Sequence, residues 1–242
     1  MRIGFITCVR LGESCLEELA ALGADLVYLG TIHDGIARNK SGRIYLDDFA
    51  DAHHVPLHKF RNMNDPDALE VIEASDLDWL YVIGWSQMAK AEVLSIPKRG
   101  VVGIHPTLLP QGRGRASIPW AIIKDLDETG VTMFKLDDGM DTGPILGQVV
   151  VPVEADETAA TLYEKVVEAA LADKQPQAHC AALTYALNDL RAALASRDEA
   201  VIAKAIVKET EYCKSCAHCQ AMHRKYSTTA TEGADKSQEK PI

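Results

Sequence analysis

Two residues that could exchange a proton stand in separate glycine- and proline-rich parts of the chain. His105 lies in the segment G-I-H-P-T-L-L-P, and Asp141 lies further along in D-D-G-M-D-T-G-P. A histidine paired with a carboxylate can act as an acid or a base near neutral pH, because the neighbouring charge controls where the ring protons sit. The two residues therefore indicate acid–base chemistry, provided that the fold brings their side chains together.

Apolar runs alternate with helical periodicity in the part of the chain that leads to His105. Continuous apolar runs predict buried strands at residues 2–9, 25–32, 55–60, 79–85 and 100–105. Helical periodicity predicts helices between them, at residues 13–22, 46–53, 66–74 and 89–95. This alternation is typical of βαβ units, so we expect an α/β fold with a doubly wound, mostly parallel, Rossmann-like sheet. In such sheets ligands bind beyond the carboxyl ends of the strands, where His105 is predicted to lie.

The pattern changes after the His105 segment. Residues 129–135 and 148–153 alternate as two strands around the loop that carries Asp141, and residues 158–171 predict a strong helix. Alanine-rich residues further on also favour helix, whereas the last sixteen residues are almost free of apolar side chains. We therefore expect a catalytic domain over residues 1–170, a helical appendage with a cysteine-rich segment over 171–226, and a disordered tail over 227–242.

Composition excludes some classes of protein. The chain has 242 residues and is 47% hydrophobic, which is enough to bury a substantial core. Its formal net charge of −10 argues against a protein that follows nucleic-acid phosphates, because such a protein needs a basic face. No stretch of eighteen apolar residues and no signal-peptide pattern is visible, so we expect a cytoplasmic protein with no membrane partner.

Four motifs together resemble the 10-formyltetrahydrofolate-dependent formyltransferases, the group that includes methionyl-tRNA, glycinamide-ribonucleotide and sugar-amine formyltransferases. They are G-I-H-P-T-L-L-P, R-G-R-A-S-I-P-W, T-G-V-T and the D-D-G-M-D-T-G loop. The resemblance implies transfer of a formyl group from 10-formyltetrahydrofolate to an amine. It assigns His105 as the proton carrier and stabiliser of the oxyanion, and Asp141 as the residue that orients His105.

The same resemblance implies two segments that hold the folate. They are the loop after a predicted strand, with Trp85, Ser86, Gln87 and Met88, and the segment before Asp141, with Lys135, Leu136, Asp137 and Asp138. Trp85 would wall the pocket by stacking. Two ordinary alternatives stay open: Trp85 ends a buried strand, and Asp138 forms an Asx-turn with its own backbone.

One position departs from the family pattern. Gly103 stands where the family has an asparagine whose side chain donates to the formyl oxygen, and losing such a donor typically costs about 10²- to 10³-fold in rate. Three explanations stay open. Another side chain such as Gln87 or Thr107 donates, a backbone N–H or a water fills the gap, or the protein binds folate or a nucleotide without catalysis.

The predicted formyl acceptor is a small-molecule amine, most simply an amino sugar carried on a nucleotide. Arg113 and Arg115 could bind an acidic group of the acceptor through their guanidinium forks, with Thr107 as a further candidate. Alternatively, Arg113 only holds its loop. Methionyl-tRNA as acceptor and hydrolysis by water remain alternative reactions, but the acidic charge makes tRNA the weaker prediction. Whether the chain forms a homodimer stays open.

A cysteine cluster lies near the end of the chain. Cys213, Cys216, Cys219 and His223 could supply a tetrahedral zinc set or thiolates for an iron–sulfur cluster. Structural zinc sites usually pair two separated C-x-x-C segments, and three cysteines spaced by three residues diverge around a continuous helix. We therefore predict no metal and keep these four residues as weak candidates.

Overall fold

A computed structural model describes residues 1–37 and 42–171, and the site is built from these residues. The strands are β1 (Arg2–Ile6), β2 (Asp25–Ile32), β3 (Leu57–Phe60), β4 (Trp79–Ile83), β5 (Gly100–His105), β6 (Glu128–Lys135) and β7 (Ile145–Pro152). The helices are α1 (Arg10–Ala21), α2 (Asp34–Ala37), α3 (Asp47–His53), α4 (Pro66–Ala74), α5 (Ala91–Ser95), α6 (Ser117–Ile123) and α7 (Ala159–Leu171).

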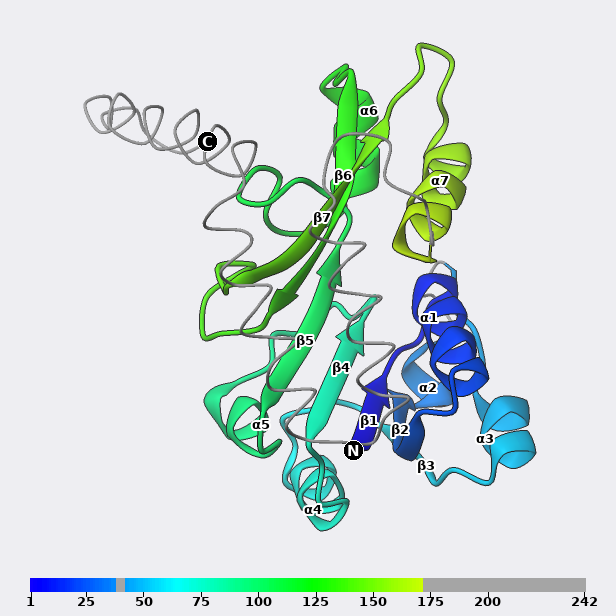
Figure 1. The fold of residues 1–242 in the computed structure, drawn as a ribbon, viewed down its shortest axis with the longest axis vertical. Coiled ribbons are helices and arrows are strands. Elements are labelled where there is room, and N and C mark those ends of the chain that lie inside the picture. Colours follow the sequence, from blue (N-terminus) through cyan, green and yellow to red (C-terminus); the bar gives the residue numbers. More distant parts are fainter. Residues whose placement is uncertain (38–41, 172–242) are drawn as a thin grey trace. The chain divides into compact units, whose positions relative to one another are not determined.

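The strands form one sheet in the order β3-β2-β1-β4-β5-β6-β7 (Figure 1). The first five are mutually parallel, whereas β6 runs antiparallel to β5 and β7 antiparallel to β6. The chain steps outward from β1 to β3 and then returns to the other side of β1 with β4, so the strand order switches direction there. The predicted doubly wound, mostly parallel α/β sheet is confirmed.

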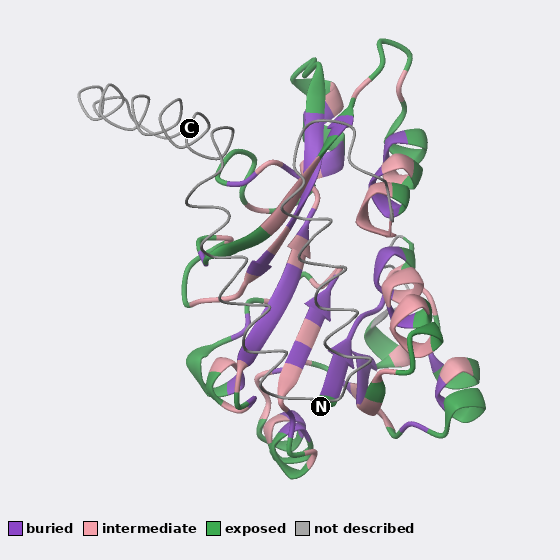
Figure 2. Ribbon diagram, viewed as in Figure 1, coloured by how far each residue is buried: buried purple, intermediate pink, exposed green. Residues whose placement is uncertain are grey.

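Helices cover both faces of the sheet, which is why its central strands read as continuous apolar runs. One core cluster joins α1, α3, α6 and α7 to one face, through residues such as Leu16, Ile118 and Val166. The other joins α4 and α5 to the opposite face, through residues such as Ile72 and Val93. Figure 2 shows β1, β4 and β5 largely buried between these layers.

Local chemistry sets several element boundaries. Asp65 precedes α4 and Pro66 is its first residue, as predicted, although the Asp65 side chain makes no capping hydrogen bond. Strand β4 ends at Ile83 and not at residue 85, because Gly84 follows with a φ of 65°, a conformation that leaves the extended region.

The first helix, α1, and the last described helix, α7, are neighbours, with α7 at the N-terminal end of α1 (Figure 1). The hydroxyl of Tyr163 on α7 accepts a hydrogen bond of 2.9 Å from the backbone N–H of Leu11 in the first turn of α1. Arg10 forms an ion pair of 2.6 Å with Glu164. The first four N–H groups of a helix have no acceptor inside the helix. Tyr163 therefore provides an acceptor for one N–H group of α1 that would otherwise lack a partner.

Some predictions fall beyond this part of the chain. The helical appendage over 171–226, apart from Leu171 at the end of α7, and the tail over 227–242 lie outside the described residues. Among residues 1–37 and 42–171, no helix has the length and apolar character needed to cross a bilayer.

Candidate active site

His105 is the last residue of β5, the final parallel strand of the sheet. Its side chain is buried, with 8% of the residue exposed, and its Nε2 lies 2.8 Å from the carbonyl oxygen of Gly112. A carbonyl can only accept, so in this arrangement Nε2 carries a proton. His105 thus holds the loop that follows its own strand.

Asp141 reaches His105 from the loop between β6 and β7. Its Oδ2 lies 3.7 Å from His105 Nδ1 and accepts a hydrogen bond of 2.8 Å from the backbone N–H of Gly114. Asp141 has a φ of 53°, a left-handed conformation that aspartate and asparagine adopt more readily than most residues. The structure therefore brings together the two residues that the sequence singled out as an acid–base pair.

Both ring nitrogens of His105 face oxygen atoms, one a carbonyl and the other a carboxylate. At 3.7 Å the carboxylate is beyond ordinary hydrogen-bond distance, but it lies beside the ring in a site where both side chains are mostly shielded from water. His105 is thus suited to donate a proton and to stabilise negative charge beside it.

Strands β6 and β7 fix the segment that follows His105. The hydroxyl of Thr132, on β6 opposite His105, donates to the carbonyl of Thr107 at 2.6 Å and accepts from the N–H of Leu109 at 3.2 Å. Gln148 on β7 donates its amide to the carbonyl of Leu109 at 2.7 Å. Thr132 and Gln148 belong to the T-G-V-T and I-L-G-Q segments, but their positioning role was not predicted, because periodicity does not show which polar side chains face a neighbouring loop.

Thr107, a predicted substrate contact, is used inside its own loop. Its residue is 6% exposed, and its hydroxyl donates to the carbonyl of Gln111 at 2.9 Å. The proton that it would offer to a formyl oxygen is therefore already committed in this arrangement.

The two predicted arginine contacts are exposed on the loop after His105. The Nε of Arg113 donates to the carbonyl of Asp141 at 2.9 Å, so this arginine joins its own loop to the Asp141 loop. The bond crosses between two loops, whereas the alternative considered for Arg113 was a role within its own loop alone. Arg115 is exposed and lies in the same short loop.

The segment from Trp85 to Met88 follows β4 and lies at the carboxyl edge of the sheet. The indole of Trp85 packs on Phe60, with ring centroids 5.4 Å apart, and its N–H donates to the side-chain oxygen of Gln87 at 3.3 Å. Ser86 and Met88 are exposed. The apolar wall predicted for Trp85 is compatible with this half-buried position.

Gln87 bonds to the backbone of the segment around Asn64, and Asn64 bonds to the backbone of the segment that follows Gln87. Gln87 donates to the carbonyl of Arg61 at 2.8 Å and accepts from the N–H of Met63 at 3.2 Å. Asn64 donates to the carbonyl of Met88 at 3.0 Å and accepts from the N–H of Lys90 at 2.8 Å. The amide of Gln87 is therefore engaged as a structural link, and Asn64 is a second link that was not predicted. The only signal for it was an asparagine-rich turn before a helix.

The other predicted folate segment runs from Lys135 to Asp138, between β6 and Asp141. The carboxylate of Asp137 accepts from the N–H of Gly139 at 3.0 Å and from the hydroxyl of Thr142 at 2.6 Å. An Asx-turn is thus present, at Asp137 and not at Asp138, and it shapes the loop that carries Asp141. Asp138 is exposed.

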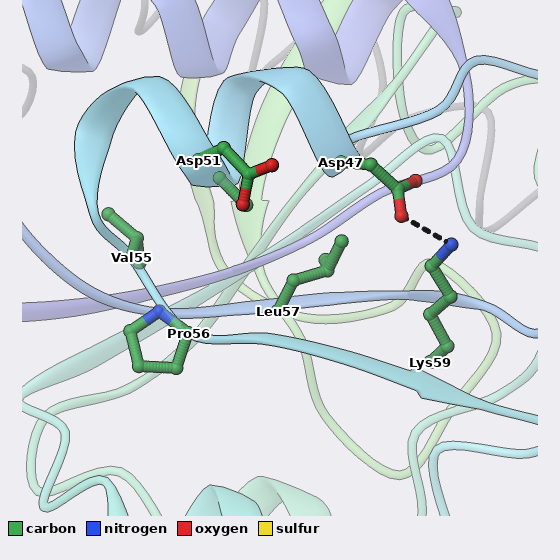
Figure 3. A pocket seen from close by; sticks show the side chains of 7 residues that line it. Asp47, Asp51, Val55, Pro56, Leu57 and Lys59 are labelled. Carbon is green, nitrogen blue, oxygen red and sulfur yellow. Dashed lines mark ion pairs between the residues drawn. The ribbon is translucent and has the colours of Figure 1, made fainter.

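A pocket of about 480 Å³ lies elsewhere, between α3 and β3 (Figure 3). The ammonium of Lys59 at its rim is paired with Asp47 at 2.7 Å and with Asp34 at 2.9 Å. Strands β2, β1 and β4 separate β3 from β5 in the sheet, so this pocket is distinct from the His105 site. Its lining residues are Asp47, Ala50, Asp51, Val55, Pro56, Leu57 and Lys59.

The weak metal candidates Cys213, Cys216, Cys219 and His223 lie outside the described residues. Within the described ranges, no group of three or more metal-binding side chains is assembled.

Comparisons with known sequences agree with the motifs. The formyl transferase family profile matches residues 20–173. A methionyl-tRNA formyltransferase from Azobacteroides pseudotrichonymphae is 32% identical over 169 residues, which is 69% of this chain and 52% of that protein. A methionyl-tRNA formyltransferase from a Synechococcus strain is 39% identical over 120 residues, 49% of this chain and 37% of that protein. The chain thus spans about half or less of the length of these relatives.

Solved structures share the fold. A phosphoribosylglycinamide formyltransferase from Bacillus halodurans has a TM-score of 0.60 at 24% identity, over 69% of this chain and 87% of that one. A sugar N-formyltransferase from a Shewanella strain has a TM-score of 0.57 at 19% identity, over 84% of this chain and 71% of that one. A sugar 3N-formyltransferase, solved in the presence of dTDP and 5-N-formyl-THF, has a TM-score of 0.55 at 17% identity, over 85% and 64%.

Proposed function

The chain belongs to the formyl transferase family, and from this membership we propose that it transfers a formyl group from 10-formyltetrahydrofolate to an amine. The observation that carries the proposal is the approach of Asp141 Oδ2 to within 3.7 Å of His105 Nδ1 at the carboxyl edge of the sheet. Ligands of doubly wound sheets bind at this edge, so the pair lies where a substrate would be.

The reaction needs one proton donor and one source of positive charge. The amine attacks the formyl carbon, and the carbonyl electrons move onto oxygen to give a tetrahedral oxyanion. Protonated His105 stabilises that oxyanion and then gives a proton to the folate nitrogen as its bond to carbon breaks, while the attacking amine loses a proton to solvent. Asp141 keeps the ring oriented from the Nδ1 side.

The folate would bind between the Trp85–Met88 segment and the Lys135–Asp138 segment. Trp85 offers an aromatic surface, and Met88, three residues further along, is 44% exposed, so apolar surface is available for a flat ring. The links from Gln87 and Asn64 hold the first segment in a fixed conformation. Ser86 and Gln87 would contribute backbone groups, and Asp138 would contribute a polar group on the other side. The end of the Lys135 side chain lies beside Gly100, the first residue of β5, so it is turned away from the His105 end of that strand.

We propose an amino sugar on a nucleotide as the acceptor. Arg113 and Arg115 are exposed on the loop that His105 holds, where guanidinium groups can bind phosphate. The likeness to sugar N-formyltransferases extends over 84% of the chain. Methionyl-tRNA is the second candidate, because the relatives that match at 32% identity carry that name.

The test follows the formyl carbon. The protein is incubated with 10-formyltetrahydrofolate labelled in the formyl group and with amino-sugar nucleotides, and the labelled products are identified. Formylated sugar supports the proposal, labelled formate alone indicates a hydrolase, and unchanged donor with a raised melting temperature indicates a binding protein. His105→Asn is the matched variant, and we expect its rate to fall by about 10²- to 10⁴-fold. A wild-type rate in His105→Asn would remove His105 from the chemistry.

A further inference from the structure

Gly103 is crowded by a neighbouring side chain. A Cβ atom placed on Gly103 would lie 2.8 Å from Leu136 Cδ2, 3.5 Å from Leu136 Cγ and 3.5 Å from Phe134 Cε1. The first distance is shorter than side-chain carbons tolerate, so any residue larger than glycine requires Leu136 to move. Gly103 lies in the middle of extended β5 and is not among the glycines with positive φ. A larger residue here would therefore meet the end of the Leu136 side chain and would not strain the backbone.

The sheet itself holds Leu136 in this place. Strand β6 pairs antiparallel with β5, with Gly103 opposite Phe134, and the N–H of Leu136 donates to the carbonyl of Val101 at 2.8 Å. Alternation along the strands then puts Leu136 on the same face as Gly103 and His105. Leu136 also packs against the buried cluster that α4 and α5 cover.

Two other side chains considered as donors are engaged elsewhere. The amide of Gln87 donates to the carbonyl of Arg61, and the hydroxyl of Thr107 donates to the carbonyl of Gln111. In the arrangement that the structure describes, these groups are used by the protein itself. His105 is the candidate whose protonation adds positive charge to the site.

We infer that Gly103 and Leu136 form a coupled pair, in which leucine fills the space that a side-chain amide on β5 would need and leaves oxyanion stabilisation to His105. The inference rests on the proposed function for its catalytic part. Its steric part does not, because the crowding exists whatever the protein does. Leu136 thereby determines what position 103 presents to the site, which is apolar surface in place of a polar donor.

The steric part is tested by a double-mutant cycle on stability. Gly103→Ala is measured alone and in a Leu136→Ala background by thermal unfolding. We expect Gly103→Ala to lower the melting temperature by at least about 2–4 °C in the native background and by clearly less when Leu136 is truncated. Leu69→Ala, in the same cluster but on α4, is the matched background, in which the cost should stay as in the native protein. If Gly103→Ala lowers the melting temperature equally in all three backgrounds, Gly103 and Leu136 are not coupled.

The catalytic part uses asparagine at the same position. Gly103→Asn alone is expected to give no gain in formyl transfer, whereas Gly103→Asn with Leu136→Ala is expected to exceed Leu136→Ala by at least about tenfold, because the amide then has room beside the reacting group. An equal gain from Gly103→Asn in both backgrounds would show that Leu136 does not block the position. The absence of any gain in the paired variant would likewise refute this part.

The two parts separate failure of the inference from failure of the proposed function. Coupled melting temperatures in a protein that never transfers formyl leave the pair intact and refute the function. If the native protein transfers formyl but the effects of Gly103→Ala and Leu136→Ala on the melting temperature are additive, the function stands and the coupling between the two residues is refuted. If Leu136→Ala does not fold, Leu136→Val, which shortens the side chain with less loss of packing, serves in both cycles.

Discussion

His105 and Asp141 both bond to the backbone of the short loop that contains Gly112 and Gly114. The ring of His105 lies 2.8 Å from the carbonyl oxygen of Gly112, and the carboxylate of Asp141 accepts from the N–H of Gly114 at 2.8 Å. Large changes at either residue would therefore disturb the loop as well as the proton chemistry. Isosteric substitutions separate the two effects.

Asp141→Asn should keep the loop and lose the charge. The amide oxygen of asparagine can still accept from Gly114, and asparagine tolerates the φ of 53° found at this position. Without a carboxylate beside Nδ1, the ring loses the group that orients it, so we expect kcat to fall by about 10²-fold or more with little change in melting temperature. A native rate in this variant would contradict the orienting role, and Asp141→Ala shows the additional cost of losing the loop bond.

Arg113→Lys tests recognition of an anionic acceptor. Lysine keeps the charge but lacks the guanidinium fork, so we expect KM for a nucleotide sugar to rise by about tenfold with kcat nearly unchanged. Arg115→Lys, on the same exposed loop, is the comparison. If kcat falls while KM stays constant, the bond of Arg113 to the Asp141 carbonyl is the function of that side chain.

Gln87→Ala tests the link between the two loops at the sheet edge. The variant loses three hydrogen bonds, to Arg61, Met63 and Trp85. We expect the free energy of unfolding to fall by about 1–3 kcal/mol, and the dissociation constant for a folate analogue to rise. Gln111→Ala, a change at an exposed glutamine, should alter stability by no more than about 0.5 kcal/mol. Unaltered folate affinity in Gln87→Ala would remove this segment from the folate site.

Glu157→Gln should produce a pH-dependent loss of stability. A hydrogen bond from the Lys165 ammonium holds the pKa of Glu157 below its ordinary value of 4.5. A lowered carboxyl pKa stabilises the fold above that ordinary value, and this contribution disappears as the pH falls through the lowered pKa. The variant should therefore melt below the native protein at pH 7 and approach it in acid. Asp156→Asn, which removes a neighbouring charge, is the comparison variant. A difference in melting temperature between Glu157→Gln and the native protein that stays constant down to pH 3 would contradict the assignment.

Apolar pattern was sufficient for most of the sheet. Strands β2 and β5 and helix α4 have the predicted bounds, because each is a run with uniform periodicity between turn-forming residues. Helix α6 was not predicted, since Pro119 interrupts the pattern. Pro119 is the third residue of that helix, where the backbone N–H has no partner within the helix, and so it is tolerated there.

The sequence was sufficient to single out His105 and Asp141, which lie close together in the candidate site, but not the contacts around them. His105 and Asp141 are marked by residue type and by the motifs around them. The engagement of Thr107 and Gln87 by backbone carbonyls depends on which loops become neighbours, and no local pattern encodes that. The same holds for Leu136, because its approach to Gly103 follows from the register between β5 and β6. Edge strand β7 begins three residues earlier than expected, at Ile145, whose exposed side chain gives no alternation signal.

The bond from Leu11 to Tyr163 sets a lower limit on the length of any fragment excised from the N-terminal part of the chain. Helix α7 contacts the first turn of α1, and its own residues Leu162 and Val166 are completely buried. A fragment cut after β7 would uncover this apolar surface and release a helix amide, so it should aggregate where one that extends through Leu171 stays monodisperse.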